Sequence, residues 1–262
     1  MMGFKNKEVT VDKKIVFLMM MAALPAVFMT GCNGNPSGPS NPVATPAPYS
    51  TPQTIPQASV NLLSSGNFVL LAYTAITNSG YTPICGSIGL APGSSVGLTG
   101  MVISCGGVTD VDDTAANTAK TDLSTAYTSA QGRTGGASIP AGANIGGQTL
   151  YPGLYIDGGD LTITSSDLTL NANGDSSAVF IFRVAGILNV TSGRKVILAG
   201  GATAANVYWA VTNFCSLGTT ASMVGNILAY NSITFNTGAS LTGRALGENG
   251  NITLLSSKVT HP

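Results

Sequence analysis

A segment near the C-terminal end of this 262-residue chain repeats with an offset of 18 residues. Residues 217–231 (LGTTASMVGNILAYN) align with residues 235–249 (FNTGASLTGRALGEN), so that apolar positions fall on apolar positions and glycine falls on glycine. Residues 251–260 continue the pattern after a one-residue slip, and residues 187–198 are a looser copy. A repeat of this kind is typical of a short structural unit stacked on copies of itself.

The length of the repeat sets the size of the stacked unit. Eighteen residues trace a circuit of at most roughly 60 Å, which suits a coil with three sides of about 20 Å each. From about residue 144 onward, short strand-like segments are separated by Gly, Asn and Ser turns without helical crossovers. The sequence therefore predicts a β-solenoid with coils about 4.8 Å apart. Residues 60–110 are expected to supply further coils and to cover an end. The alternative is a β-sandwich in which the 18-residue similarity arises by chance.

One segment, residues 110–133, has helical periodicity. Asp112 or Asp113 can cap the N-terminus of this helix, and Gly132 can end it. We expect a helix over about residues 113–131 that lies along one side of the solenoid. The stripe expected to face the solenoid consists of Ala115, Ala116, Ala119, Leu123, Ala126, Tyr127 and Ala130.

Charged residues are scarce in this chain. The 11 basic and 11 acidic residues make up only 8% of it, against about 25% in an average protein. The net charge of zero gives no electrostatic basis for binding nucleic acid or acidic substrates. The single histidine, His261, is next to the end, and no CxxC or Cys/His pattern is present. We therefore expect no metal site, no cofactor and no nucleic-acid partner.

The N-terminal residues are typical of an export signal. Lysines form a positive region, and residues 15–29 are a short apolar run, whereas a membrane span needs about 20 apolar residues. The run ends in MTGC, which is similar to a bacterial lipobox, although Met29 replaces the usual leucine. In that interpretation Cys32 becomes the lipid-modified first residue of the mature protein. A plain secretory signal with a chance cysteine is the alternative.

These features divide the chain into three parts. Residues 1–31 form the predicted signal peptide, residues 32–58 a tether rich in Pro, Ser and Thr, and residues 59–262 the solenoid domain. A lipid on Cys32 would anchor the domain at the bacterial cell envelope or surface and would be its only contact with the membrane. Without the lipid the protein is secreted. We expect it to be a monomer.

Export permits disulfide bonds among the remaining cysteines. Cys85 and Cys105 would close a short loop and are the favoured pair. Cys215 lies between apolar residues at strand spacing. It is expected to be a buried free thiol that packs as a small hydrophobic residue.

Several long stretches, in order along the chain, resemble a known family, the ice-binding proteins of the DUF3494 type. The resemblance covers about residues 60–260 and includes SSGNFVLLAYTAITNSG, AKTDLSTAYTSAQGRT, LTLNANGDSSAVFIFRV and SLGTTASMVGNILAYNSITFNTGASLTGRAL. It implies an all-β fold with one long helix, namely an irregular three-sided right-handed β-helix with an α-helix packed alongside. It also implies adsorption to the surface of an ice crystal rather than catalysis.

Some members of this family carry a T-A/G-x-T/N motif on the face that adsorbs to ice. Residues 237–240 (TGAS) resemble this motif, with Ser240 in the last place. Residues 219–222 (TTAS) depart further from it, because Thr220 occupies the position of Ala or Gly. The resemblance therefore implies an ice-binding face near these two segments.

Alternation along the strands separates the outward hydroxyls into two sets. One set, with Ser216, Thr234 and Thr253, lies on a different side from the motif-like residues, and Arg244 lies on the remaining side. Thr and Ser hydroxyls both donate and accept, so they can hold water in fixed positions, although they are also ordinary solvent-facing strand residues. We predict ice binding by the other set, which comprises Thr219, Thr220, Ser222, Thr237, Ser240, Thr242 and Thr260.

A polysaccharide lyase is one rival function, because such enzymes also use three-sided solenoids. Catalysis would need clustered carboxylates, basic residues or bound calcium in a groove. The local acidic residues include the DGGD segment, which is simply interpreted as a turn. They are Asp157, Asp160, Asp167 and Asp175.

A surface adhesin that binds glycans is the second rival. It would need exposed aromatic platforms, for which Tyr208 and Trp209 are the candidates. Trp209 lies in a strand with Val207 and Val211, so we expect it in the core instead.

Overall fold

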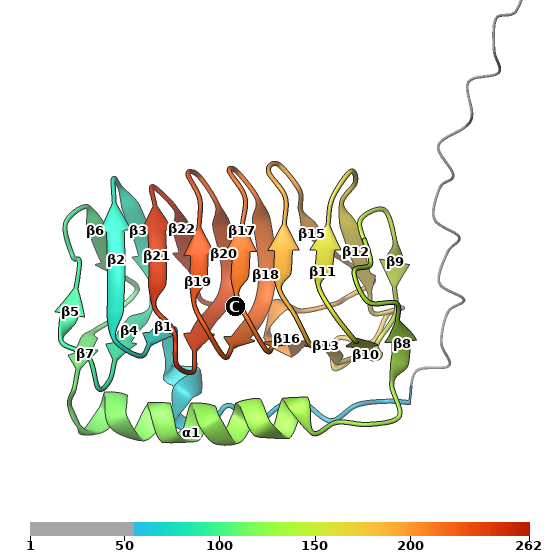
Figure 1. Ribbon diagram of the computed structural model, residues 1–262, viewed down its shortest axis with the longest axis horizontal. Coiled ribbons are helices and arrows are strands. Elements are labelled where there is room, and N and C mark those ends of the chain that lie inside the picture. Colours follow the sequence, from blue (N-terminus) through green and yellow to red (C-terminus); the bar gives the residue numbers. More distant parts are fainter. Residues whose placement is uncertain (1–54) are drawn as a thin grey trace, which may run out of the picture. The chain divides into compact units, whose positions relative to one another are not determined.

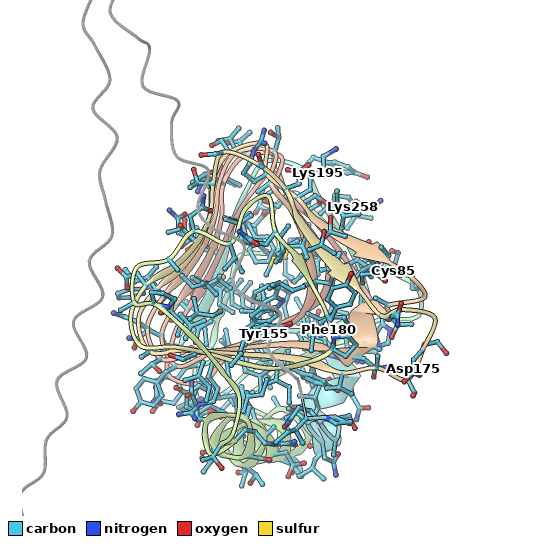
Figure 2. The ribbon with its side chains drawn as sticks, turned by 90° about the vertical axis from the view of Figure 1, so that its right-hand side faces the viewer. Cys85, Tyr155, Asp175, Phe180, Lys195 and Lys258 are labelled. Atoms are coloured by element: carbon cyan, nitrogen blue, oxygen red, sulfur yellow. A yellow bond between two sulfur atoms is a disulfide. The ribbon has the colours of Figure 1, made fainter. Side chains whose placement is uncertain are left out.

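The computed structural model describes residues 55–262, which form a β-solenoid of parallel strands with one long helix along it (Figure 1). The predicted signal peptide, the lipidation site at Cys32 and the predicted tether up to residue 54 lie outside the described residues. Each coil passes over three sides, which appear as a triangle when the solenoid is viewed along its axis (Figure 2). Within residues 55–262, no helix has both the length and the apolar character that crossing a membrane requires.

The three sides are named here by what covers or composes them. The covered side, which packs against the helix, contains β8 (Ala137–Ile139), β10 (Gly153–Asp157), β13 (Phe180–Val184), β16 (Val207–Val211), the second halves of β18 (Ser222–Ala229) and β20 (Ser240–Gly247), β1 (Phe68–Ala72), β4 (Ser87–Leu90) and β7 (Thr109–Val111). The seven-stranded side contains β11 (Leu161–Ile163), β14 (Leu188–Val190), β17 (Cys215–Leu217), β19 (Ile233–Phe235), β21 (Ile252–Leu255), β2 (Ala75–Ser79) and β5 (Ser95–Val96). The third side contains β9 (Thr149–Leu150), β12 (Leu168–Asn171), β15 (Val196–Ala199), the first halves of β18 and β20, β22 (Lys258–Thr260), β3 (Thr82–Cys85) and β6 (Met101–Ser104). Short 3-10 helices span Leu63–Asn67 and Ala204–Asn206.

The predicted 18-residue repeat corresponds to the register in which the strands of adjacent coils pair. In β17 and β19, Cys215 pairs with Ile233 and Leu217 with Phe235, at the 18-residue offset. The long strands β18 and β20 keep the same offset from Ser222 to Ala229. All these pairs are parallel, which confirms the solenoid and excludes the alternative β-sandwich.

The coils do not stack in sequence order. β1 pairs with β20 and β4, β2 with β21 and β5, and β3 with β22 and β6. The coil of residues 68–85 therefore follows the last coil of the chain, and residues 87–104 form the next one. The helix then returns the chain to the opposite end, where β8 begins the remaining coils (Figure 1). This arrangement confirms that residues 60–110 supply further coils.

The helix α1 (Thr114–Gln131) lies along the covered side. The Asp113 carboxylate caps its N-terminus by accepting a hydrogen bond from the Ala116 amide at 2.8 Å, and the helix ends at Gly132, as predicted. Leu123 and alanines of the helix pack against Leu228 and other outward apolar residues of the covered side. The prediction for Ala115 was wrong: it is exposed, because it lies one residue off the spacing of the buried alanines.

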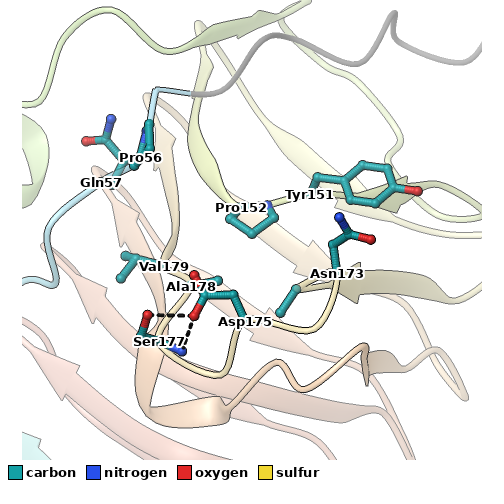
Figure 3. A pocket seen from close by; sticks show the side chains of 10 residues that line it. Pro56, Gln57, Tyr151, Pro152, Asn173, Asp175, Ser177, Ala178 and Val179 are labelled. Atoms are coloured by element: carbon teal, nitrogen blue, oxygen red, sulfur yellow. Dashed lines mark hydrogen bonds between the residues drawn. The ribbon is translucent and has the colours of Figure 1, made fainter.

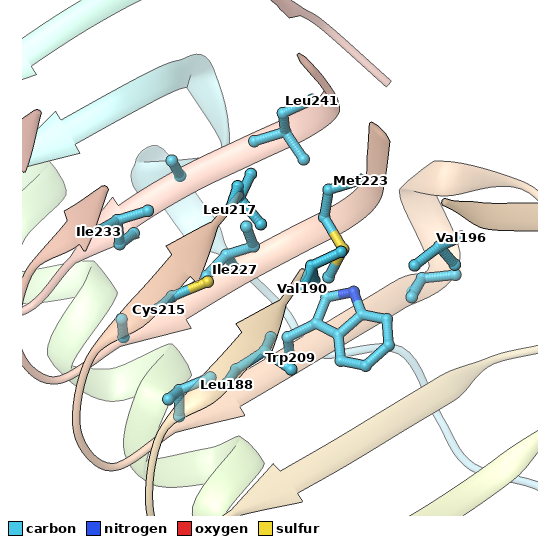
Figure 4. Packing of buried hydrophobic residues seen from close by; sticks show 14 of the residues in the cluster. Leu188, Val190, Val196, Trp209, Cys215, Leu217, Met223, Ile227, Ile233 and Leu241 are labelled. Atoms are coloured by element: carbon cyan, nitrogen blue, oxygen red, sulfur yellow. The ribbon is translucent and has the colours of Figure 1, made fainter. Parts of the chain in front are cut away.

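Buried side chains from all three sides fill the interior (Figure 4). The Trp209 ring stacks on Phe182 with centroids 4.1 Å apart, and Phe182 stacks on Tyr155 at 5.1 Å. The indole nitrogen of Trp209 donates to the carbonyl oxygen of Val224 at 2.9 Å, so its one polar group is satisfied. This aromatic column joins three successive coils from the inside.

Two stacked glycines form the corner between the third side and the covered side. Gly225 and Gly243 are aligned in the sequence repeat and pair in the structure, with φ of 104° and 152°. A Cβ on Gly243 would lie 1.9 Å from the carbonyl oxygen of Gly225. The corner therefore excludes any side chain at this position, which explains why the repeat has glycine there.

The three cysteines among residues 55–262 are arranged as the sequence predicts. Cys85 and Cys105 form a disulfide bond that joins β3 to the turn after β6. Cys215 is buried and free, and burial raises the pKa of its thiol to about 12. The free thiol is therefore part of the core.

Candidate functional site

A straight row of small polar side chains follows the seven-stranded side from coil to coil. In most strands of this side a residue that faces outward lies between two buried residues, so each strand contributes one side chain to the row. Consecutive members are paired in register and lie about 4.8 Å apart. We call this row the central ladder. It consists of Thr162, Asn189, Ser216, Thr234, Thr253 and Thr77.

The central ladder is uncharged, and buried core residues hold the backbone beneath it in place. No residue in the strands of this side is charged. Ile233 and Phe235, which flank Thr234, are fully buried, so the backbone beneath the hydroxyl is fixed by core packing. The hydroxyl of Thr77 donates to that of Thr253 at 3.1 Å. The result is a regular, flat array of hydroxyl and amide groups.

Polar side chains also line the two margins of the seven-stranded side. Toward the third side, Thr191 and Asn236 each donate a side-chain hydrogen bond to a carbonyl oxygen of a neighbouring strand, at 3.1 and 3.0 Å. Toward the covered side, the Phe214 ring is 48% exposed. Ser232 and Asn251 occupy the same position as Phe214 on the next two coils, and the Asn251 backbone amide donates to the Ser232 hydroxyl at 3.1 Å. Polar groups therefore continue at both margins, with Phe214 as an exposed apolar residue at the second one.

The residues predicted from the sequence are divided between a corner and the third side. Thr219, Thr220 and Thr237 lie in turns between the seven-stranded side and the third side, and all three are exposed. The Thr220 amide donates to the Thr237 carbonyl oxygen at 2.9 Å, so the turns stack on each other. These threonines border both sides.

Ser222 and Ser240 pair with each other on the third side. Their row continues into Lys195 at one end and Lys258 at the other. Lysine ammonium groups are strongly hydrated, so they interrupt an array that has to match the lattice of ice.

Thr242 and Thr260 form a second pair on the same side. Their row continues into Val224 at one end and the disulfide-bonded Cys85 at the other. The predicted set is therefore brought together in short pairs rather than in one long row.

The sequence repeat predicts only three of the six members of the central ladder as one set, namely those in β17, β19 and β21. Asn189 pairs with Ser216 across a 27-residue offset, and Thr77 comes from a coil distant in sequence. The sequence does contain a signal for the other three. Each of them is the polar middle residue of a three-residue segment similar to ITF, the segment around Thr234. The segments are LTI, LNV and ITN for Thr162, Asn189 and Thr77.

The four carboxylates considered for catalysis each accept a hydrogen bond from a backbone amide. Asp157 accepts from Gly159 at 3.0 Å, which confirms the predicted turn, and burial raises the pKa of this carboxyl. Hydrogen bonds from Ser177 lower the pKa of Asp175. Among residues 55–262, no three His, Cys, Asp or Glu side chains are grouped in a way that could hold a metal ion. The four are Asp157, Asp160, Asp167 and Asp175.

The two aromatic residues considered for glycan binding, Tyr208 and Trp209, are buried. Trp209 is fully buried, and Tyr208 is 5% exposed beneath the helix. This confirms the expectation that Trp209 is a core residue. The two side chains therefore provide no platform for a sugar ring.

A pocket of about 410 Å³ is lined by residues of neighbouring coils, including Tyr151 and Asn173 (Figure 3). It contains a single carboxylate, Asp175, which accepts hydrogen bonds from the amide and hydroxyl of Ser177 at 2.9 and 2.6 Å. A polysaccharide lyase would need clustered carboxylates, basic residues or bound calcium in its groove. The lining of this pocket has neither a second carboxylate nor a basic side chain beside Asp175.

Residues 70–260 match the family model described as "Ice-binding-like". An ice-binding protein of Flavobacterium frigoris (strain PS1) is 37% identical over 215 residues, which cover 78% of this chain and 76% of the relative. An ice-binding protein of Nostoc sp. (strain HG1) is 34% identical over 207 residues, covering 78% of this chain and 75% of the relative.

Solved structures share the fold. The crystal structure of an ice-binding protein from an Antarctic biological consortium matches with a TM-score of 0.76 and 43% identity, over 79% of this chain and 94% of that one. That of an ice-binding protein from the Antarctic ascomycete Antarctomyces psychrotrophicus matches with a TM-score of 0.72 and 31% identity, over 78% of this chain and 98% of that one.

Proposed function

This chain belongs to the ice-binding-like family, and from that premise we propose that it adsorbs to ice through its seven-stranded side. The observation that supports this choice is the central ladder, six uncharged polar residues in register across six strands. The covered side is occupied by α1. The third side has hydroxyl rows only two residues long, each ended by lysines or by apolar and disulfide-bonded residues.

The physical basis is a regular pattern of water held at the ladder. Each hydroxyl can donate and accept, and the strand spacing of about 4.8 Å repeats from coil to coil. Waters bound to such an array bridge the protein to the ice lattice with little enthalpic loss. One contact is weak, but a rigid face engages many contacts together. Adsorbed protein then inhibits the growth or recrystallisation of the crystal, or holds the cell at ice.

The choice of side is tested by a matched pair of variants. Ser216→Tyr with Thr234→Tyr places two bulky rings in the central ladder, while Ser240→Tyr with Thr242→Tyr places them on the third side. We expect the first variant to lose most of its thermal hysteresis and its partitioning into growing ice, and the second to retain both. Circular dichroism checks that both variants remain folded.

The reverse result would move the site to the third side, as the motif-like residues suggest. Full activity in both variants would contradict adsorption through either flat side. Absence of hysteresis and ice partitioning in the unmodified protein would contradict the proposed function itself.

We propose further that the protein is exported and anchored by a lipid on Cys32. The support is the sequence alone: a positive region, a short apolar run and MTGC at residues 29–32. Cells fed radiolabelled palmitate are expected to label the protein, and Cys32→Ala is expected to abolish the label. A label that persists in this variant would contradict the anchor.

A further inference from the structure

The described residues include seven basic side chains, and five of them are engaged within the protein. For example, Lys120 donates to the carbonyl oxygens of Gly247 and Glu248, and Arg244 donates to that of Gly66 at 2.8 Å. Each of these cations donates at least one hydrogen bond to a backbone carbonyl oxygen. The five are Lys120, Arg133, Arg183, Arg194 and Arg244.

The two other cations of residues 55–262, Lys195 and Lys258, are exposed, and their ammonium groups form no ion pair or hydrogen bond within that range. Both lie on the third side (Figure 2). They belong to one row, since Lys195 pairs with Ser222, Ser222 with Ser240, and Ser240 with Lys258. Three strand spacings of about 4.8 Å separate them, or about 14 Å.

The nearest carboxylate along this row does not neutralise the lysines. Asp167 lies beside Lys195, but it faces the Arg194 guanidinium at 3.6 Å and accepts the Lys195 backbone amide at 3.0 Å. The charges of Asp167 and Arg194 offset each other. The positive charges of Lys195 and Lys258 are therefore not neutralised along this row. Residues 55–262 as a whole contain nine acidic against these seven basic side chains, so the positive charge is local to this row.

The surroundings of the row suit an extended sugar chain. Between the lysines, Ser222 and Ser240 offer hydroxyls that both donate and accept. Beside the row, Ile197 is 43% exposed, and Tyr81, which directly precedes β3, the strand next to β22, is 65% exposed. The tyrosine ring can stack on the carbon–hydrogen face of a pyranose ring, and the isoleucine side chain can make apolar contact beside it.

We propose that the third side binds an acidic polysaccharide laid along the solenoid axis. Carboxylates of the sugar chain meet Lys195 and Lys258, and its hydroxyl groups bond to Ser222 and Ser240. A pyranose residue is about as long as one strand spacing, so uronates three residues apart on an extended chain reach both ammonium groups. The charge complementarity favours this occupant over a neutral glycan. The inference does not depend on ice adsorption, because it concerns a different side.

The test is a titration of the purified protein with sodium polygalacturonate at low ionic strength, with neutral dextran for comparison. We expect binding to polygalacturonate that weakens with salt, and none to dextran. Lys195→Gln with Lys258→Gln is expected to weaken binding about tenfold, as two exposed ion pairs allow. Lys195→Arg with Lys258→Arg keeps both charges and is expected to retain binding.

Equal affinity in the Gln variant and the unmodified protein would overturn the proposal, and so would loss of binding in the Arg variant. Binding to phosphatidylserine vesicles without binding to polygalacturonate would also overturn it, in favour of a membrane surface. Thermal hysteresis measured on the same samples separates this result from the ice function, because the Gln variant leaves the central ladder intact.

Discussion

Thr77 and Thr253 are 176 residues apart in the sequence, yet the hydroxyl of Thr77 donates to that of Thr253 at 3.1 Å. The bond joins the first coil of the chain to its last one. It continues the central ladder between two coils that are not consecutive in the chain. A continuous face can therefore form from segments that are far apart in the sequence.

A ring placed in the middle of the ladder should be more damaging than the same ring at Thr162, beyond which only Asn144 pairs, through an isolated bridge. Thr234→Tyr divides the ladder into shorter runs, whereas Thr162→Tyr leaves the other five members contiguous. Because adsorption depends on many contacts engaged together, we expect the lower thermal hysteresis for Thr234→Tyr. Equal losses in the two variants would show that contiguity has no role.

Gly243→Ala is expected to destabilise the fold by about 3 kcal/mol, because the new Cβ would meet the Gly225 carbonyl oxygen at 1.9 Å and the φ of 152° is strained. Gly193→Ala is the matched control. Its φ is 72°, but no atom lies within 4 Å of the new Cβ, so about 1 kcal/mol is expected. Urea unfolding measures both values. Similar losses would show that backbone strain, rather than contact between coils, decides the effect.

Removal of the disulfide by Cys85→Ser with Cys105→Ser is expected to reduce the free energy of unfolding by about 3 kcal/mol, since the bond closes a loop with a sequence separation of 20 residues. Urea unfolding with and without reductant checks this value. Reductant should destabilise the unmodified protein and leave the serine variant unchanged. A reductant effect of the same size in both would assign it to another cause.

Lys120 makes stability depend on pH. Burial lowers the pKa of its ammonium group to about 8, whereas the unfolded chain keeps the proton up to about pH 10.4. Between these values the unfolded state binds more protons, so the free energy of unfolding rises with pH, by at most about 3 kcal/mol. Below pH 8 both states are protonated and this contribution is constant.

The variant Lys120→Met isolates this contribution. The difference in unfolding free energy between the unmodified protein and the variant should change from pH 7.5 to 9.5 and be constant from pH 5 to 7. Tyr155, whose pKa burial raises to about 12, is common to both proteins and cancels in the difference. A difference that is constant throughout would contradict the lowered pKa.

Much of the fold could be predicted because its constraints are local in the sequence. The 18-residue register recurs between adjacent coils that are contiguous in the chain, and the corner glycines Gly225 and Gly243 mark it. The Asp113 cap and Gly132 set the helix bounds for the same reason. Helix capping and turn geometry act over a few residues, so they are visible without the tertiary structure.

The full set of residues that share a row on one side could not be predicted in this way. Lys195 joins the row of Ser222 through a single bridge at a 27-residue offset, so the sequence repeat does not reveal that this row is charged. Likewise Thr77 joins the central ladder only because the first coil stacks on the last. Which residues share a side depends on coil lengths and coil order, and both follow from packing of the whole domain.

The order of the coils has a consequence for how this chain is made. The first coil pairs on one side with the last coil, through β1 with β20, β2 with β21 and β3 with β22. The coil that is translated first therefore pairs with the coil that is translated last. A nascent chain on the ribosome cannot complete its stack until residues near 260 have emerged. In a repeat array stacked in chain order each new coil can pack on the one made before it, whereas here the first coil lacks one of its two neighbours until the last coil has been made.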